Sequence, residues 1–156
     1  MSRKDFFDDP AAPAANSLVP GVSAIVANDA RELVLQRRTD NDLWALPGGV
    51  MDIGESIAAA LVREVQEETG LDVEPFAIVG VYSDPRHVFA YSDGEVRQEL
   101  SICFACRIVG GRLAASDESH EVAFVAPDRL SDLDMHPSIA LRIRHYLERR
   151  PQPFIG

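Results

Sequence analysis

The stretch Gly48–Leu71 reads GGVMDIGESIAAALVREVQEETGL and combines a glycine-rich start with a helical pattern. Pro47 precedes its first two glycines and Gly54 follows them, and such residues interrupt regular helices and central strands. From Glu55 onward, apolar side chains recur at the three- and four-residue spacing of one helix face: Ala58, Leu61, Val62 and Val65. Gly70 is placed to end this helix. The stretch therefore predicts a loop that leads into an amphipathic helix.

A second face of the predicted helix carries three glutamates, Glu64, Glu67 and Glu68. At spacings of three and four residues their like charges are neighbours, and each pair costs an isolated helix about 0.2–0.5 kcal/mol. They also crowd the C-terminal half, where the helix dipole disfavours anions. A hard cation such as Mg²⁺ would remove this penalty, because it binds carboxylate oxygens together with water and substrate phosphates. For three glutamates alone, a solvated acidic face is the simpler interpretation.

The wider spacing resembles the Nudix box. Gly49 is followed after five residues by Glu55, and after seven more by the run Arg63–Leu71, which reads REVQEETGL. The chain is therefore identified as similar to Nudix hydrolases of the MutT-like kind. Pro85 lies beyond the box at a position that resembles the ADP-ribose pyrophosphatase branch.

The remaining chain predicts strands mixed with a second helix. Apolar or alternating runs predict strands at residues 19–27, 32–37, 44–46, 73–82 and 121–125, a hairpin formed by 87–91 and 95–109, and a helix from Pro137 to about Arg149. Residues 32–37 are expected to be the antiparallel partner of 19–27, and the apolar run 73–82 to be buried on both faces. The fold class is α/β (α+β), a single-domain α/β/α sandwich with a mixed sheet, as the Nudix resemblance also implies.

Length and composition bound the domain organisation. A chain of 156 residues has the length of a single domain. We expect a flexible N-terminal arm over residues 1–17, a Nudix domain over 18–150 and a short tail over 151–156. No apolar run is long enough to cross a membrane, and the acidic N-terminus lacks the apolar core of a secretory signal, so a cytoplasmic location is expected.

The net charge of −10 argues against a nucleic-acid partner, because Lys and Arg drive binding to a phosphate backbone. It does not argue against a small nucleotide-derivative substrate, since bound metal ions reverse the local sign. No membrane partner is expected, and the resemblance leaves a homodimer open.

Cys103 and Cys106 form a C-x-x-C spacing, which occurs in redox pairs and zinc sites. They fall in a predicted strand, where residues three apart point to opposite faces, and no second pair exists. We interpret both as small apolar residues of a sheet.

The resemblance implies roles for the acidic residues of the box, with Mg²⁺ or Mn²⁺ as cofactor. Glu67 and Glu68 would bind metal, and Glu64 would be a further ligand, the general base, or both. Glu55 would support the ligands, the carbonyl of Gly48 would add another, and Arg63 would orient the glutamates. A guanidinium can fork onto carboxylates and fix their rotamers.

Many Nudix enzymes take the general base from a later loop. In this chain that loop is Ser116–Glu121, reading SDESHE. Glu118 is the candidate and Glu121 the second choice. A polar loop with no catalytic role is an open alternative.

Substrate-binding candidates follow the predicted strand 73–82. Arg86 could meet a terminal phosphate, while Tyr82 and His87 could stack on a base. The expected function is metal-dependent hydrolysis of the pyrophosphate bond of a nucleoside diphosphate linked to another moiety, of the ADP-ribose or nucleotide-sugar type. A sanitising nucleoside triphosphate pyrophosphohydrolase is the alternative within this class, and a non-catalytic ligand sensor is the alternative outside it.

Overall fold

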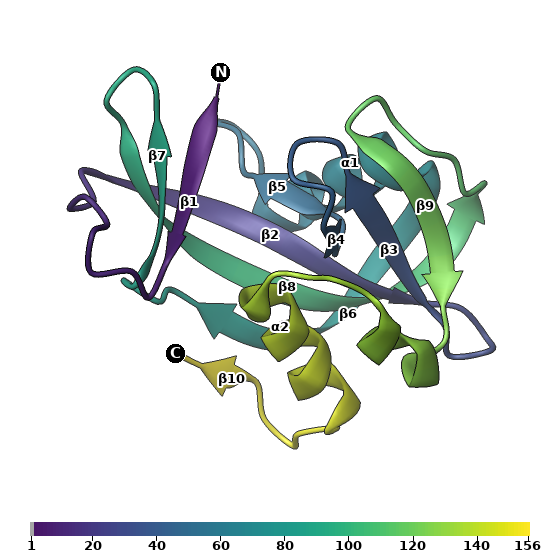
Figure 1. The fold of residues 1–156 in the computed structure, drawn as a ribbon. Helices are drawn as coiled ribbons and strands as arrows, with labels where there is room; N and C mark the ends of the chain where they lie inside the picture. Colours follow the sequence, from purple (N-terminus) through teal and green to yellow (C-terminus); the bar gives the residue numbers. More distant parts are fainter. Residues whose placement is uncertain (1) are drawn as a thin grey trace.

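Strand β2 (Ser17–Ala27) lies at the centre of the sheet in the computed structural model, which describes residues 2–156. It pairs in parallel with β8 (Val96–Gly111) along its whole length, and antiparallel with the short β5 (Gly48–Val50). The sheet order is β1 (Arg3–Phe7), β7 (His87–Tyr91), β8, β2, β3 (Leu33–Arg38) and β4 (Trp44–Ala45). In addition, β6 (Leu71–Tyr82) pairs with β8, β10 (Phe154–Ile155) with β6, and β9 (Ser119–Val125) with β3. A mixed sheet, as expected, therefore organises the chain (Figure 1).

The predicted strands and helices occur in the predicted order, but three strands were not predicted: β1, β10, and β5, which lies where a loop was expected. The helices are α1 (Ile57–Thr69), the 3₁₀ helix η1 (Pro127–Asp132) and α2 (Pro137–Leu147). No helix among residues 2–156 is both long enough and apolar enough to span a membrane.

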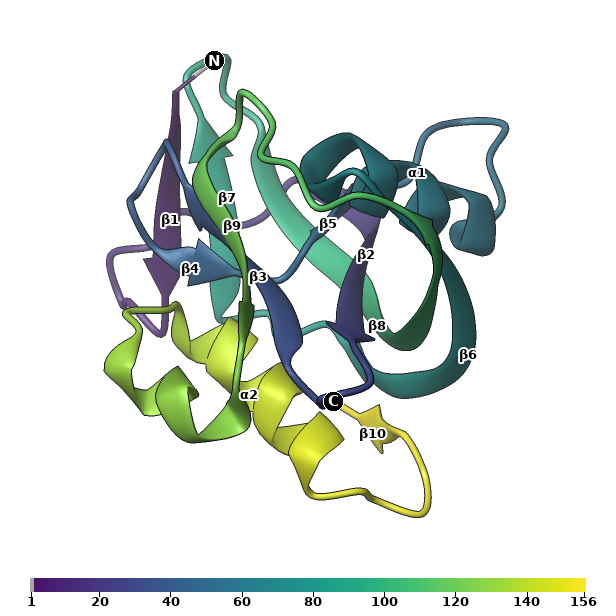
Figure 2. The ribbon, with the colours of Figure 1, turned by 90° about the vertical axis from the view of Figure 1, so that its right-hand side faces the viewer.

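Two hydrophobic cores lie on opposite faces of the sheet because side chains alternate along β2. Val22, Ala24 and Val26 pack with Leu61 and Val65 of α1. On the other face, Ile25 belongs to a cluster that includes Ile143 of α2. Figures 1 and 2 show the two helices on opposite sides of the strands. The α/β/α arrangement predicted from the sequence is confirmed.

Helix α1 has well-defined ends. The Ser56 side chain accepts a hydrogen bond from the Ala59 amide, and Gly70 ends the helix with a φ of 76°, a conformation that favours glycine. The predicted apolar face is only half right, because Ala58 and Val62 are exposed. The buried face is rotated, and it consists of Ala60, Leu61, Val65, Glu68 and Thr69.

One predicted strand pairing is present only at its end, and one predicted burial is wrong. Strands β2 and β3 share a single register pair, Ala27 with Leu33, since β3 pairs mainly with β9. Strand β6 is not buried on both faces: Phe76 and Ile78 are exposed. Both differences arise because local patterns do not show which strand pairs with which, or which element covers a given face.

The N-terminal residues do not form the loose arm that the sequence suggested. Arg3–Phe7 form β1, which pairs antiparallel with β7. Phe6 is buried against Val88 and Val96 in a third apolar cluster. The prolines and alanines that suggested disorder lie after this strand.

Cys103 and Cys106 are free thiols buried in different cores, Cys103 on the α2 side and Cys106 on the α1 side. Opposite faces are what the strand interpretation required. Burial raises the pKa of Cys103 to about 11 and that of Cys106 to about 12. A thiol that is neither accessible nor ionised is chemically inert.

We therefore expect native protein at pH 8 to resist alkylation by iodoacetamide, and denatured protein to take up two equivalents, counted by intact-mass spectrometry. Rapid labelling of the native protein would contradict the structural interpretation of this pair.

Candidate active site at the carboxylates of α1

The glutamates of α1 divide between its inner and outer sides. Glu68 is 4% exposed, and the Glu64 side chain is 14% exposed, whereas the Glu67 side chain is 58% exposed. The spacing of four residues places Glu64 and Glu68 one turn apart on the side that meets the sheet. Two carboxylates thus face inward and the third lies at the rim.

Strand β5 brings backbone against both inner carboxylates. The Gly48 amide donates a 2.8 Å hydrogen bond to Oε2 of Glu68. A Cβ atom at Gly49 would lie 2.5 Å from the carboxyl carbon of Glu64. At Gly48 an added Cβ would collide with the backbone of Val22, so the fold requires glycine there, whereas at Gly49 it would displace the end of the Glu64 side chain. The glycines and inner carboxylates form one oxygen-rich cradle.

Arg63 binds the carboxylates around it. Its guanidinium donates to both oxygens of Glu55, at 2.5 and 3.0 Å, to Glu64 at 2.9 Å and to Glu67 at 3.2 Å. It also donates to the Val50 carbonyl at 3.2 Å. These contacts hold the acidic side chains in place, which agrees with the orienting role that the sequence suggested.

The charges of the inner carboxylates are only partly balanced by nearby positive charge and hydrogen bonds. Burial raises the pKa of Glu68 to about 8, and the charge of Glu64 adds to the rise while the Gly48 hydrogen bond opposes it. Burial also raises the pKa of Glu64, with Arg63 opposing. A buried carboxylate is costly unless a cation pairs with it. Carboxylate oxygens that converge with little positive charge nearby are suitable ligands for a divalent ion such as Mg²⁺ or Mn²⁺.

The predicted loop lies beside this cradle. Glu118 lies just before β9, and its backbone carbonyl accepts hydrogen bonds from the amide and the hydroxyl of Thr39 at 3.0 and 3.2 Å. The Glu118 charge contributes to raising the pKa of Glu64, so the two carboxylates lie in each other's field. Glu121 lies on β9 opposite Arg37.

A cavity of about 300 Å³ extends from Gly48 and Gly49 to residues of α2. It contains all three predicted substrate-binding residues, Tyr82, Arg86 and His87. It also contains residues from β1 and α2 that the sequence gave no reason to combine, notably Arg3, Asp5, Phe7, His136 and Arg142. No local pattern marks these residues, because the cavity forms only when both ends of the chain pack near β7.

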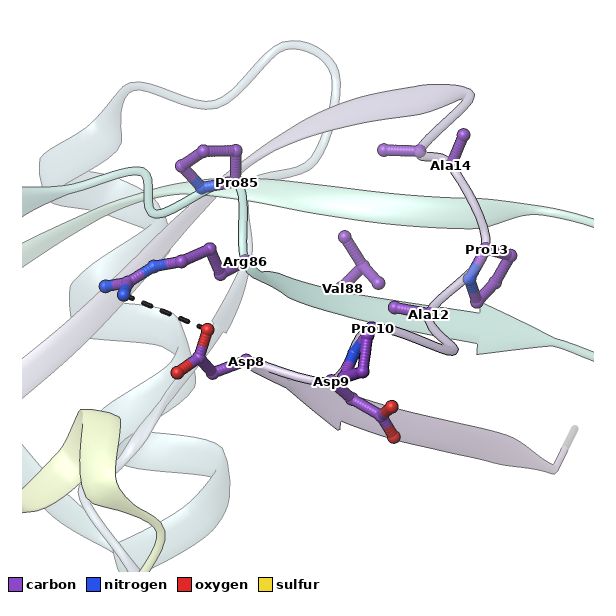
Figure 3. Close-up of a pocket in the computed structure, with 10 residues that line it drawn as sticks. Asp8, Asp9, Pro10, Ala12, Pro13, Ala14, Pro85, Arg86 and Val88 are labelled. Carbon is purple, nitrogen blue, oxygen red and sulfur yellow. Dashed lines mark ion pairs between the residues drawn. The ribbon is translucent and has the colours of Figure 1, made fainter.

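Arg86 and Tyr82 already have partners in the cavity wall. Arg86 binds Asp84 at 2.8 Å and lies 4.0 Å from Asp8, the ion pair drawn in Figure 3, where it borders a second cavity beside the N-terminal loop. The Tyr82 hydroxyl lies 2.9 Å from Nδ1 of His145. A phosphate would therefore compete with carboxylates for Arg86.

His87 and His136 stack on each other at 4.5 Å and flank Asp5. Nε2 of His87 lies 2.8 Å from the Asp5 carboxylate, and Nε2 of His136 lies 3.8 Å from it. Nδ1 of His136 accepts the Ser138 amide, so the neutral ring carries its proton on Nε2. These contacts join β1 and β7 to the start of α2.

The NUDIX domain model matches residues 17–147, most of the chain. The chain belongs to the NUDIX domain family. Nudix hydrolases generally need divalent metal ions, which agrees with the cradle of carboxylates on α1. The match covers the whole sheet apart from β1 and β10.

Known relatives include enzymes with different substrates. The chain is 35% identical to an ADP-ribose pyrophosphatase of Methanocaldococcus jannaschii over 72% of this chain and 64% of the relative. It is 37% identical to a putative 8-oxo-dGTP diphosphatase of Bacillus subtilis over 70% of this chain and 68% of the relative. The chain thus spans about two thirds of the length of these relatives.

The fold is that of solved Nudix structures. An ADP-ribose pyrophosphatase from Streptococcus suis superposes with a TM-score of 0.68 at 23% identity, over 88% of this chain and 98% of that structure. This likeness concerns the fold alone.

Proposed function

We propose that this protein is a divalent-metal-dependent Nudix pyrophosphohydrolase that cleaves the pyrophosphate bond of a nucleoside diphosphate linked to another moiety, of the ADP-ribose or nucleotide-sugar type. The observation that carries the proposal is the convergence of Glu64 and Glu68 on the Gly48–Gly49 backbone at one end of a cavity. The diphosphate would lie at the carboxylates and the rest of the substrate in the cavity.

The residues of the cradle have distinct roles in this proposal. Glu64, Glu67 and Glu68 would hold Mg²⁺ or Mn²⁺ with the Gly48 carbonyl, and Glu55 would act through Arg63. Bound divalent ions neutralise phosphate oxygens and lower the pKa of an attacking water. Arg63 keeps the carboxylates at fixed positions, so little reorganisation is needed when the ions bind.

A triphosphate substrate is the second candidate, and the relative named as a putative 8-oxo-dGTP diphosphatase favours it. A non-catalytic ligand sensor would have no need of the acidic set. This chain keeps Glu55, Glu64 and Glu67 together around Arg63, and Glu68 at the Gly48 amide.

The proposal is tested by measuring phosphate release, after a coupling phosphatase, from ADP-ribose, nucleotide sugars, dinucleoside polyphosphates and triphosphates including 8-oxo-dGTP. Each substrate is assayed with Mg²⁺, Mn²⁺ or EDTA. We expect metal-dependent cleavage concentrated on a diphosphate derivative. A preference for triphosphates would favour the second candidate, and inactivity of folded protein on the whole panel would overturn both.

Glu118 is our candidate for the general base, with Glu121 as a matched control on the same segment. Glu118→Gln is expected to lower kcat about 100-fold, the lower range for loss of a general base, while Glu121→Gln stays near wild type. KM should change little in either variant. If Glu118→Gln keeps its kcat, the base is Glu64.

Three further predictions from the sequence remain predictions: the domain boundaries at residues 18 and 150, a homodimer, and a cytoplasmic location. A small substrate is expected as the partner, with neither nucleic acid nor membrane.

A further inference from the structure

Arg142 of α2 lies in the wall of the cavity that begins at Gly48 and Gly49. Its guanidinium lies over the ring of Tyr82, 4.8 Å from the ring centroid. Its Nε is buried and has no hydrogen-bond partner among residues 2–156. The flat face of the guanidinium is therefore covered by an aromatic ring, while its Nε donor is unused among the described residues.

The other arginines of the cavity differ from Arg142 because each has a carboxylate partner. Arg38 binds Asp40 at 2.9 Å, Arg86 binds Asp84 at 2.8 Å, and Arg3 lies 3.7 Å from Asp40. Arg142 forms no ion pair within 4 Å among the described residues.

Leaving the buried Nε donor unpaired is costly. Burial lowers the pKa of the Arg142 guanidinium, and nearby groups including Glu99 offset this only in part. A ligand that accepts hydrogen bonds from Arg142 would recover this cost. The cavity thus holds a preformed donor fork at a distance from the metal-binding carboxylates.

Glu99 of β8 lines the same cavity and provides an acceptor near this donor. The two side chains are close enough for their charges to interact, yet they do not pair directly. A second phosphate would be repelled by Glu99. A flat, neutral group with acceptors next to donors fits both residues, and a nucleobase edge is such a group.

We propose that Arg142 determines the base specificity of this enzyme by donating to O6 and N7 of a guanine base. The guanidinium fork matches two adjacent acceptors, and guanine presents them whereas adenine presents an amino donor beside N7. Glu99 would accept from N1–H and the N2 amino group on the other side of O6. This inference rests on the proposed function, and it favours a guanosine diphosphate derivative over ADP-ribose.

The test compares guanine and adenine ligands in wild type, Arg142→Met and Arg142→Lys. Methionine keeps the packing on Tyr82, and lysine keeps the charge but cannot form the fork. Arg144→Met is the matched control, because Arg144 lies on the same helix with an exposed side chain. Thermal unfolding without ligand shows whether each variant is folded.

Binding of GMP and AMP is measured by calorimetry in EDTA, so it does not depend on turnover. We expect wild type to bind GMP at least about ten-fold more tightly than AMP, since one bidentate arginine–base contact gives about ten-fold discrimination or more. Both Arg142 variants should lose this preference, mainly through weaker GMP binding, and Arg144→Met should keep it. The ratio of kcat/KM for GDP-mannose to that for ADP-ribose should fall in parallel.

Equal weakening of GMP and AMP binding in the Arg142 variants, or a wild-type preference for AMP, would overturn the inference. Arg142-dependent GMP binding by a protein that hydrolyses nothing would leave the inference standing and overturn the proposed function. Metal-dependent hydrolysis with a base preference that does not change in the Arg142 variants would overturn the inference and leave the proposed function standing.

Discussion

Glu68→Gln is expected to remain folded while metal-dependent turnover falls at least about 100-fold, beyond the 10–100-fold typical of groups that only support a ligand. Glutamine has the shape of glutamate and its carbonyl can still accept the Gly48 amide, but it lacks the charge that holds a divalent ion. The measurement is kcat/KM at several Mg²⁺ concentrations, with the unfolding midpoint measured in parallel.

The same substitution should stabilise the metal-free protein, and more so at higher pH. The pKa of Glu68, about 8 in the fold, lies above its ordinary value, so its contribution to stability is present at low pH and is lost as pH rises through about 8. The glutamine side chain does not ionise, so its contribution to stability does not change over this pH range. In EDTA, the midpoint of Glu68→Gln should therefore exceed that of wild type by a larger margin at pH 9 than at pH 6.

Glu67→Gln is the matched comparison, because Glu67 is exposed at the rim and its loss should not stabilise the fold. If Glu68→Gln kept near wild-type turnover at saturating Mg²⁺, the assignment of Glu68 as a metal ligand would be wrong.

Gly49→Ala and Gly48→Ala are expected to affect different properties, turnover in the first and stability in the second. A Cβ at Gly49 meets the end of the Glu64 side chain, which can rotate away, so we expect near-normal stability and at least about a ten-fold loss of turnover from the misplaced carboxylate. A Cβ at Gly48 meets the backbone of Val22 and Ser23, which cannot rotate away, so we expect a fall in stability of about 1–3 kcal/mol. Urea unfolding and steady-state kinetics on both variants separate the two effects.

A stable, fully active Gly49→Ala protein would show that Glu64 does not need its position for catalysis. A Gly48→Ala protein as stable as wild type would show that β5 can move away from β2.

Much of the fold could be predicted from the sequence because the information is local. The cap at Ser56, the stop at Gly70 and the alternation of strand residues specify elements through their own backbone preferences. The partner of each strand is not local information. The long pairing of β3 with β9, beside its single register pair with β2, depends on contacts between segments far apart in the chain, and so does the strand formed by Arg3–Phe7.

The sequence by itself determined the family and the set of acidic residues, because the spacing from Gly49 to Leu71 is a property of one continuous segment. Only the tertiary structure decided that Glu68 is buried and Glu67 is exposed, since the rotation of α1 depends on which side chains the sheet covers. The cavity was likewise decided by packing. Arg142 is unremarkable on its own helix, and it becomes a candidate specificity residue only because α2 carries it to the cavity that begins at Gly48.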